Sequence, residues 1–168
     1  MNGLVLGLNS AFGSPVSMLR TELNDALKNA LRNQEKRCLS TVRLILAALK
    51  DRDICARGRG NTDGVDDAEV LEMLQSMIKQ RRDSISMYEQ GGRCELAERE
   101  QEEIDIIRRF MPAQLGDDEI RGAVADVIEE LGASSLKDMG RVMASLKDRF
   151  SGRMDFGQAS AVVKENLA

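Results

Sequence analysis

The chain has 168 residues, only two of them proline and 3% of them aromatic, so we expect one or two small helical domains with aliphatic cores. Its net charge of −4 gives no overall attraction to nucleic acid, and no apolar run approaches the ~20 residues of a membrane helix. The sequence has no histidine, which excludes histidine general bases, Ser-His and Cys-His catalysis, and histidine-containing zinc sites.

Residues 1–17 carry no charged side chain. Their apolar stretch is too short for a secretory signal, and no basic residue precedes it. These residues also lack the arginines of a transit peptide. We expect a disordered N-terminal extension on a cytoplasmic protein. The spacing of the three cysteines, Cys38, Cys55 and Cys94, fits neither a C-x-x-C motif nor a zinc site, which favours free thiols in a reducing compartment.

Apolar residues spaced three and four positions apart predict an amphipathic helix over residues 19–31 and a second over residues 39–49. The next segment, ARGRGNTDG at 56–64, is predicted to be a flexible, solvated loop. Its arginines and glycines could hold a phosphate, but the common phosphate-binding loops join a strand to a helix. A calcium loop does not fit, because Arg59 would stand at the first ligand position.

Two further helices are predicted to complete the part of the chain before Pro112. A capping box at Asp66 begins the third helix, and Gly91 or Gly92 takes the left-handed conformation that ends it. The fourth helix is stopped by Pro112, where we place the end of an N-terminal four-helix domain, residues 18–112. The arginine pairs of KQRRDS and DIIRRF stand among acids, and ion pairs within each helix explain them as solvated faces.

Three shorter helices are predicted for a C-terminal domain over residues 113–168. The acids of GDDE begin the fifth helix, where the helix dipole favours negative charge, and Gly132 ends it. Ser135 is expected to cap the sixth helix and Asp155 the seventh. The predicted fold class is therefore all-α: an N-terminal helical domain with a long helical hairpin, plus a small C-terminal three-helix domain.

Ser134 to Lys137 matches S-x-x-K, a pattern that can mark an acyl-enzyme serine. That chemistry needs a neutral lysine close to the serine and an oxyanion hole, and the sequence has no S-D-N or K-T-G partner motif. A helix cap followed by a solvated lysine has the same spacing. No catalytic residue is therefore assigned.

The region from Ser135 to Ala168 differs from the rest in charge, with six basic and four acidic residues and hence a net charge of +2. Cations and exposed backbone amides are the groups that bind a phosphate backbone. The region lacks an aromatic stacking platform, which disfavours reading of single-stranded bases and leaves shape-directed contact with folded RNA. The predicted nucleic-acid-binding residues are Lys137, Arg141, Lys147, Arg149, Arg153 and Lys164.

Two segments of the sequence resemble the GatB/YqeY family. KQRRDSISMYEQGGRCELAEREQEEIDIIRRFMPAQL is similar to the family's long helical hairpin, including its closing Pro-x-Gln-Leu. KDMGRVMASLK and GRMDFGQASAVVKENL resemble its C-terminal part, with K-D-M-G and G-R-x-D at matching places. The resemblance covers about residues 18–168. Besides basic residues, the matching positions are Gly140, interpreted as a site of close helix packing, Gly152, and Asp155, interpreted as a helix cap.

The resemblance implies a stand-alone YqeY-like protein whose C-terminal part is similar to the tail of the B subunit of the glutamine-dependent tRNA amidotransferase. In that enzyme the tail contacts tRNA, and the chemistry lies in a separate cradle domain, to which no segment here is similar. The expected function is a non-catalytic accessory protein that binds tRNA or associates with a tRNA-amidotransferase or synthetase complex. Neither a cofactor nor a metal is expected, nor DNA or a membrane as a partner.

Two alternatives stay open at this point. The helical hairpin could make the chain a protein–protein interaction module whose arginine and glutamate faces set its specificity. A carbon–nitrogen ligase with glutamine as amido-N-donor would need a site for ATP or ammonia, for which the sequence offers no phosphate loop and no histidine.

Overall fold

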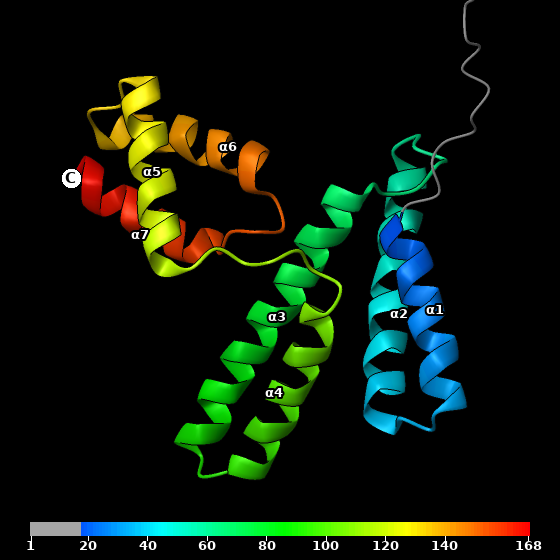
Figure 1. The fold of residues 1–168 in the computed structure, drawn as a ribbon. Helices are drawn as coiled ribbons and strands as arrows, with labels where there is room; N and C mark the ends of the chain where they lie inside the picture. The colour runs from blue at the N-terminus through cyan, green and yellow to red at the C-terminus, as the bar shows by residue number, and fades with distance from the viewer. Residues whose placement is uncertain (1–17) are drawn as a thin grey trace, which may run out of the picture.

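The computed structural model describes residues 18–168, and all the regular structure in that range is helical, so the all-α fold class is confirmed (Figure 1). The predicted N-terminal extension, residues 1–17, lies outside the described residues. None of the described helices is long and apolar enough to cross a membrane. The elements are α1 (Met18–Arg32), α2 (Lys36–Gly58), α3 (Asp67–Gln90), α4 (Cys94–Arg108), α5 (Asp117–Leu131), the 3₁₀ helix η1 (Leu136–Asp138), α6 (Met139–Phe150) and α7 (Phe156–Leu167).

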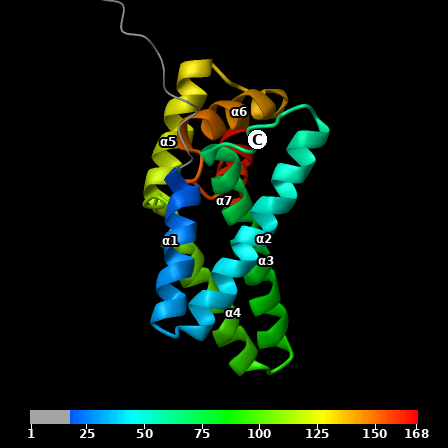
Figure 2. The same ribbon diagram turned by 90° about the vertical axis from the view of Figure 1, so that its right-hand side faces the viewer.

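Helices α1–α4, the N-terminal part, form two helical hairpins that pack on each other (Figures 1 and 2). Aliphatic side chains from all four helices make one buried cluster, in which Leu23, Ile45, Leu74 and Ile107 are fully buried. Burying an aliphatic side chain of this size contributes about 1.5–3 kcal/mol. This cluster explains why the sequence needs apolar residues at helical spacing in each of the four segments.

Helices α5–α7, the C-terminal part, lie together at the end of the molecule opposite the turn between α3 and α4 (Figures 1 and 2). They bury a second cluster, which includes Ile120, Val124, Leu146, Met154 and Val163. Residues 109–116, the linker, connect the two parts. The two clusters lie on either side of the predicted boundary at Pro112; the division into independent domains stays a prediction.

Several helix ends follow the predictions. The Asp66 carboxylate accepts the Glu69 amide at 2.8 Å, and the Glu69 side chain bonds back to the Asp66 amide, which confirms the capping box. Gly92 and Gly132 adopt the left-handed conformation, with φ of +69° and +58°. The fourth helix ends at Arg108, earlier than the expected stop at Pro112.

The predicted cap at Ser135 is wrong. Its side chain makes no capping hydrogen bond, and the chain first forms η1 before α6 begins. The Asp138 carboxylate instead accepts the amide of Ser134 at 3.2 Å. This carboxylate accepts an amide that precedes the helix, whereas a serine cap would accept an amide within its first turn.

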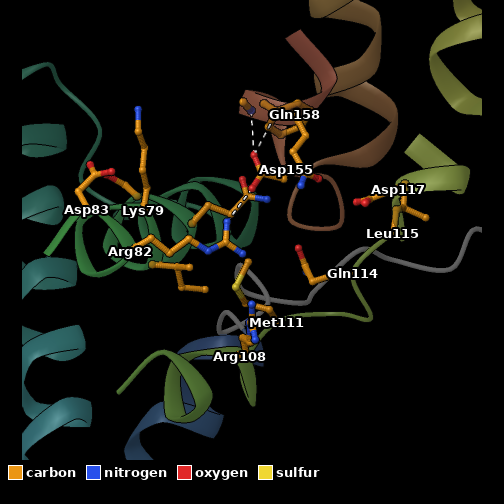
Figure 3. Close-up of a pocket in the computed structure, with 15 residues that line it drawn as sticks. Lys79, Arg82, Asp83, Arg108, Met111, Gln114, Leu115, Asp117, Asp155 and Gln158 are labelled. Atoms are coloured by element: carbon orange, nitrogen blue, oxygen red, sulfur yellow. Dashed lines mark hydrogen bonds and ion pairs between the residues drawn. The ribbon is translucent and has the colours of Figure 1, made fainter. Parts of the chain in front are cut away.

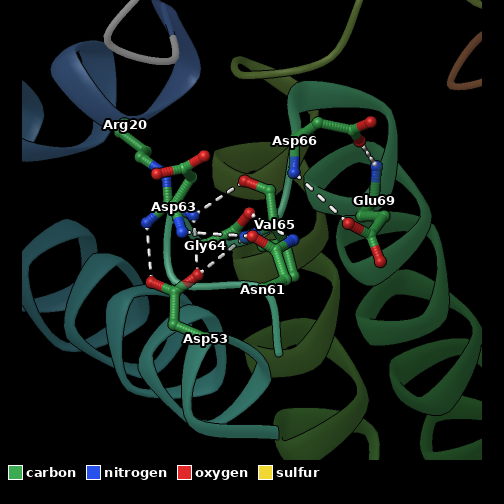
Figure 4. Close-up of polar contacts among 8 residues, drawn as sticks. All are labelled: Arg20, Asp53, Asn61, Asp63, Gly64, Val65, Asp66 and Glu69. Atoms are coloured by element: carbon green, nitrogen blue, oxygen red, sulfur yellow. Dashed lines mark hydrogen bonds and ion pairs between the residues drawn. The ribbon is translucent and has the colours of Figure 1, made fainter. Parts of the chain in front are cut away.

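The loop between α2 and α3 is solvated as predicted, since residues 57–63 are exposed, but α2 extends through Gly58 and hydrogen bonds hold the end of the loop at Val65 (Figure 4). Arg20 on α1 donates to both carboxylate oxygens of Asp53, each at 2.7 Å, and to the carbonyl of Val65 at 2.8 Å. Asp53 also accepts the Val65 amide at 3.0 Å. Residues 56–58 belong to α2, and Asn61 closes the turn by bonding to the Gly64 carbonyl.

The ion pair of Arg20 and Asp53 is shielded from water, since the two side chains are 23% and 17% exposed. The hydrogen bond from Arg20 lowers the pKa of Asp53 below its ordinary value, burial opposes this change, and the Val65 amide adds to it. A lowered folded-state pKa stabilises the fold fully above the unfolded pKa. That stabilisation disappears as the pH falls through the folded pKa.

Replacing Asp53 by Asn tests this anchor. We expect Asp53→Asn to lower the free energy of unfolding at pH 7 by about 1–3 kcal/mol, because Arg20 loses its charged acceptor. The loss should begin to shrink as the pH falls below about 4, the ordinary pKa of an aspartate, and disappear only as the pH passes the lowered pKa of Asp53 in the folded protein. Urea unfolding at both pH values measures it. Asp51→Asn, at an exposed position of α2, is the matched control, and equal effects of the two substitutions at pH 7 would contradict the anchor.

Candidate functional site

The loop that joins α6 to α7 holds the C-terminal part against α3. We call residues 151–155 the docking loop. Three successive backbone carbonyls of this loop accept hydrogen bonds from other segments: Gly152 from Gln114 Nε2 at 2.6 Å, Arg153 from the Leu115 amide at 2.8 Å, and Met154 from Gln75 Nε2 at 2.9 Å. The donors come from the linker and from α3, so the loop is bonded to both.

Gly152 fits this place because it has no side chain. Its φ of +75° lies in the left-handed region that favours glycine. A Cβ atom there would lie 2.5 Å from Leu71 Cδ1 on α3, which is too close for any real contact. The G-R-x-D motif therefore places a glycine against α3, and the Gln114 of the Pro-x-Gln-Leu motif bonds to that same glycine.

Asp155 has two structural roles. Its carboxylate accepts the amides of Gly157 at 2.9 Å and Gln158 at 3.3 Å, which confirms the predicted cap of α7. It also forms an ion pair with Arg82 of α3, with 2.7 Å between Arg82 Nη1 and Asp155 Oδ2. Burial raises the pKa of Asp155, but the bonds from Arg82 and from the two amides lower it more, so the pKa lies below its ordinary value.

The arginine pair of KQRRDS was predicted to form ion pairs within its own helix, and that prediction is wrong. Arg81 binds Glu103 on α4 at 2.8 Å, and Arg82 binds Asp155 of the docking loop. Both partners lie far away in the sequence, where helical spacing gives no signal. The sequence pattern therefore did not indicate that Arg82 joins the two parts of the molecule.

A cleft of about 890 Å³ lies beside the docking loop, between the two parts of the molecule (Figure 3). The middle of α3 and the end of α4 form one side, and the linker and the first turns of α5 and α7 form the other. Figure 3 shows Arg82 extending toward Asp155, with Arg108 and Met111 below it and Gln114 facing them. This volume lies in the range of ligand-binding sites.

None of the six predicted nucleic-acid-binding residues lines this cleft. Arg141 donates to the Leu131 carbonyl at 2.9 Å and pairs with Asp138, and Arg149 pairs with Glu130. Both arginines thus contact the last turn of α5 or its neighbourhood. The other four are exposed and form no ion pair within residues 18–168: Lys137, Lys147, Arg153 and Lys164. Their assignment to RNA binding stays a prediction.

The remaining residues singled out in the sequence are Gly140, the S-x-x-K match and the cysteines. Gly140 is exposed, and a Cβ atom there would meet nothing within 4 Å, so its interpretation as a close-packing site is wrong. Ser134 and Lys137 of the S-x-x-K match are both exposed. Among the described residues, all three cysteines are free thiols, and no cluster of three or more Cys, Asp or Glu could hold a metal ion.

Comparison with known proteins places the chain among YqeY-like sequences. The family model described as Yqey-like protein matches residues 20–167. A relative from Clavispora lusitaniae, named altered inheritance of mitochondria protein 41, mitochondrial, is 29% identical over 92% of this chain and 85% of its own length. Relatives of the same name from Lachancea thermotolerans and Pyrenophora tritici-repentis are each 30% identical, over 76% and 83% of this chain and 68% and 77% of their own lengths.

These names correct one expectation. The relatives are named as mitochondrial proteins, which contradicts the cytoplasmic location expected from the sequence. That expectation depended on the absence of charge in residues 1–17 and on the free cysteines. Free cysteines report a reducing environment and do not identify the compartment.

The two glycines of the C-terminal motifs give a direct test of the docking loop. We expect Gly152→Ala to lower the free energy of unfolding by about 2–4 kcal/mol, because the new methyl group combines a strained backbone with a clash against Leu71. Gly140→Ala should change stability by no more than about 1 kcal/mol, in the stabilising direction, because alanine favours a helix. Urea unfolding of both variants measures the difference.

A second substitution separates the clash from the backbone strain. In the Gly152→Ala/Leu71→Ala double variant the clashes with Leu71 Cδ1 and Cγ are removed and only a 3.0 Å approach to the Cβ atom of residue 71 is left, so the two effects should be less than additive. Strict additivity would assign the whole loss to backbone strain, whereas equal stability of Gly152→Ala and Gly140→Ala would show that the docking loop does not need its glycine.

Proposed function

This chain belongs to the YqeY-like protein family, and from that premise we propose that it is an accessory protein that binds tRNA through its C-terminal part. The observation that supports the proposal is the set of exposed cations in that part that form no ion pair among residues 18–168: Lys137, Lys147, Arg153 and Lys164. A surface cation without an ion pair can bind phosphate without first losing a bond to a carboxylate of its own chain. Its attraction to phosphate is therefore not reduced by a competing internal interaction.

The pairing of Arg141 and Arg149 is compatible with the same role. Both arginines and the carboxylates they bind are largely at the surface, apart from the more buried Asp138. Surface ion pairs contribute only about 0–1 kcal/mol. A phosphate can therefore replace the carboxylate at little cost, and the two arginines stay within the proposed surface.

Arg153 is the proposed phosphate-binding residue whose backbone is held most firmly by contacts with other segments. Its backbone carbonyl is bonded to the Leu115 amide, and the glycine before it is packed against α3. The side chain is nevertheless exposed. The docking loop thus fixes the backbone of a cation and leaves its guanidinium group free to contact phosphate.

Binding of purified tRNA tests the proposal. Each lost phosphate contact removes about one unit from the slope of log K against log salt concentration. We expect Lys147→Ala/Arg153→Ala to weaken binding about tenfold at ~0.1 M salt and to reduce the slope by about two. The matched control, Lys50→Ala/Arg59→Ala, removes one lysine and one arginine from exposed positions of the N-terminal part. Filter binding at several salt concentrations measures all three proteins.

Two results would contradict the proposal: failure of the wild type to bind tRNA, or equal weakening by the two double variants. Binding that requires an amidotransferase subunit and hardly depends on salt would favour the alternative, an amidotransferase-associated protein without its own RNA surface. The proposal assigns no catalytic residue.

We further propose that the chain acts in mitochondria, as the names of its relatives say of them. The full chain with a fluorescent protein at its C-terminus, expressed in yeast, should colocalise with a mitochondrial matrix marker. The C-terminal position of the tag leaves residues 1–17 unblocked. Diffuse fluorescence throughout the cytosol would contradict this location.

A further inference from the structure

The cleft beside the docking loop combines three kinds of group that one nucleotide needs. Its charged side chains include Arg82 and Arg108, its apolar ones include Met111 and Phe156, and its amide side chains include Gln158 (Figure 3). These groups come from four separate segments: α3, α4, the start of the linker and the beginning of α7. Only the packing of the docking loop against α3 brings them together.

The arginines mark where a phosphate would bind. Arg82 uses Nη1 to bind Asp155, and its other guanidinium nitrogens form no hydrogen bond or ion pair within the described residues. Arg108 is 45% exposed and has only a long, 3.8 Å pair with Asp105. Arginine is the side chain best suited to phosphate, because its planar nitrogens donate two parallel hydrogen bonds.

The apolar and amide groups suit a base. Met111 is half-buried, and Phe156 supplies an aromatic ring, which the sequence analysis did not recognise as part of a binding surface. An aromatic ring provides a face on which a base can stack, and an apolar side chain beside it excludes water. The side chain of Gln158 forms no hydrogen bond within the described residues, so it can pair with the edge of a base.

The acids of the cleft limit the orientation and the class of ligand. Asp155 is already bound by Arg82 and by two amides, while Asp83 and Asp117 line the cleft without an ion pair among the described residues. A free carboxylate repels a phosphate but accepts a hydrogen bond from a ribose hydroxyl. The phosphate therefore belongs beside Arg108, with the sugar toward an acid.

We propose that the cleft binds one unpaired ribonucleotide of the RNA that the C-terminal part contacts. The inference rests on the proposed function, and it adds a site that none of the six predicted basic residues lines. The cations of the C-terminal part attract the folded body of the RNA, and the cleft takes a nucleotide that is not base-paired.

The cleft is tested first with isolated nucleotides. In ¹⁵N-labelled wild-type protein, AMP or CMP at up to about 10 mM should shift the side-chain amide signals of Gln114 and Gln158. The 2′-deoxynucleotides and inorganic phosphate should produce smaller shifts. Arg108→Ala should weaken nucleotide binding about five- to tenfold, whereas Arg121→Ala, an exposed arginine of α5 outside the cleft, should leave it unchanged.

Two RNA hairpins then test the link to RNA, one blunt and one with an unpaired 3′ overhang. The overhang should strengthen binding to the wild type and to Arg121→Ala, and this advantage should disappear in Arg108→Ala. Lys147→Ala/Arg153→Ala should weaken binding of both hairpins by the same factor. Arg121→Ala removes the same charge from outside the cleft, so a general charge effect would reduce the overhang advantage in both single variants alike.

The outcomes separate the two proposals. Equal affinity for the two hairpins, nucleotide-induced shifts confined to other parts of the protein, or equal behaviour of Arg108→Ala and Arg121→Ala overturns the inference and leaves the proposed function intact. Failure to bind either hairpin, with nucleotide shifts still located in the cleft, overturns the proposed function and the RNA source of the ligand, and retains the cleft as a site for a free nucleotide.

Discussion

The contact of Gly152 with Leu71 is the constraint on which the arrangement of the two parts depends. A polypeptide backbone can approach a leucine on α3 this closely only where no Cβ intervenes. The hydrogen bonds from Gln114 to the Gly152 carbonyl and from Gln75 to the Met154 carbonyl need the same approach, because a loop pushed away from α3 would lengthen them. The ion pair of Arg82 with Asp155 adds a further bond between α3 and the last residue of the docking loop. One glycine thus sets the relation between two hydrophobic clusters that share no buried residue.

The two kinds of cation have different roles in this molecule. Arg20, Arg81 and Arg82 form the bonds that join separate helices or loops. Lys137, Lys147 and Lys164 are exposed and form no ion pair within residues 18–168. A guanidinium group binds a carboxylate through a fixed pair of donors and loses little water, while an ammonium group is strongly hydrated and holds its partner loosely. The internal contacts therefore use arginine, and the solvated lysines remain available to an external anion.

Helix positions could be read from the sequence because they depend on neighbours three and four residues away. The capping box at Asp66, the left-handed glycines and the cap of α7 at Asp155 are local in this sense. The contacts that form the cleft join residues 38 to 79 positions apart, such as Gln75 with Met154, and no local pattern encodes them. The same limit explains why the sequence did not indicate the anchor of the loop after α2, since Arg20 lies 45 residues before Val65. Glycines and polar residues there predicted the exposed turn, but no local pattern indicated the ion pair that holds its end.

The net charge of −4 is a poor guide to whether this chain can bind RNA. The region from Ser135 to Ala168 carries +2, so the remainder of the chain carries −6. At physiological salt the Debye length is about 8 Å, so a phosphate responds to the cations it contacts and hardly to acids on distant helices. At low salt the screening length grows, and repulsion from the acidic remainder increases together with attraction by the C-terminal part. The dependence of binding on salt should therefore be shallower than the number of contacting cations implies, and it should flatten at the lowest salt concentrations, where the opposing charges begin to cancel.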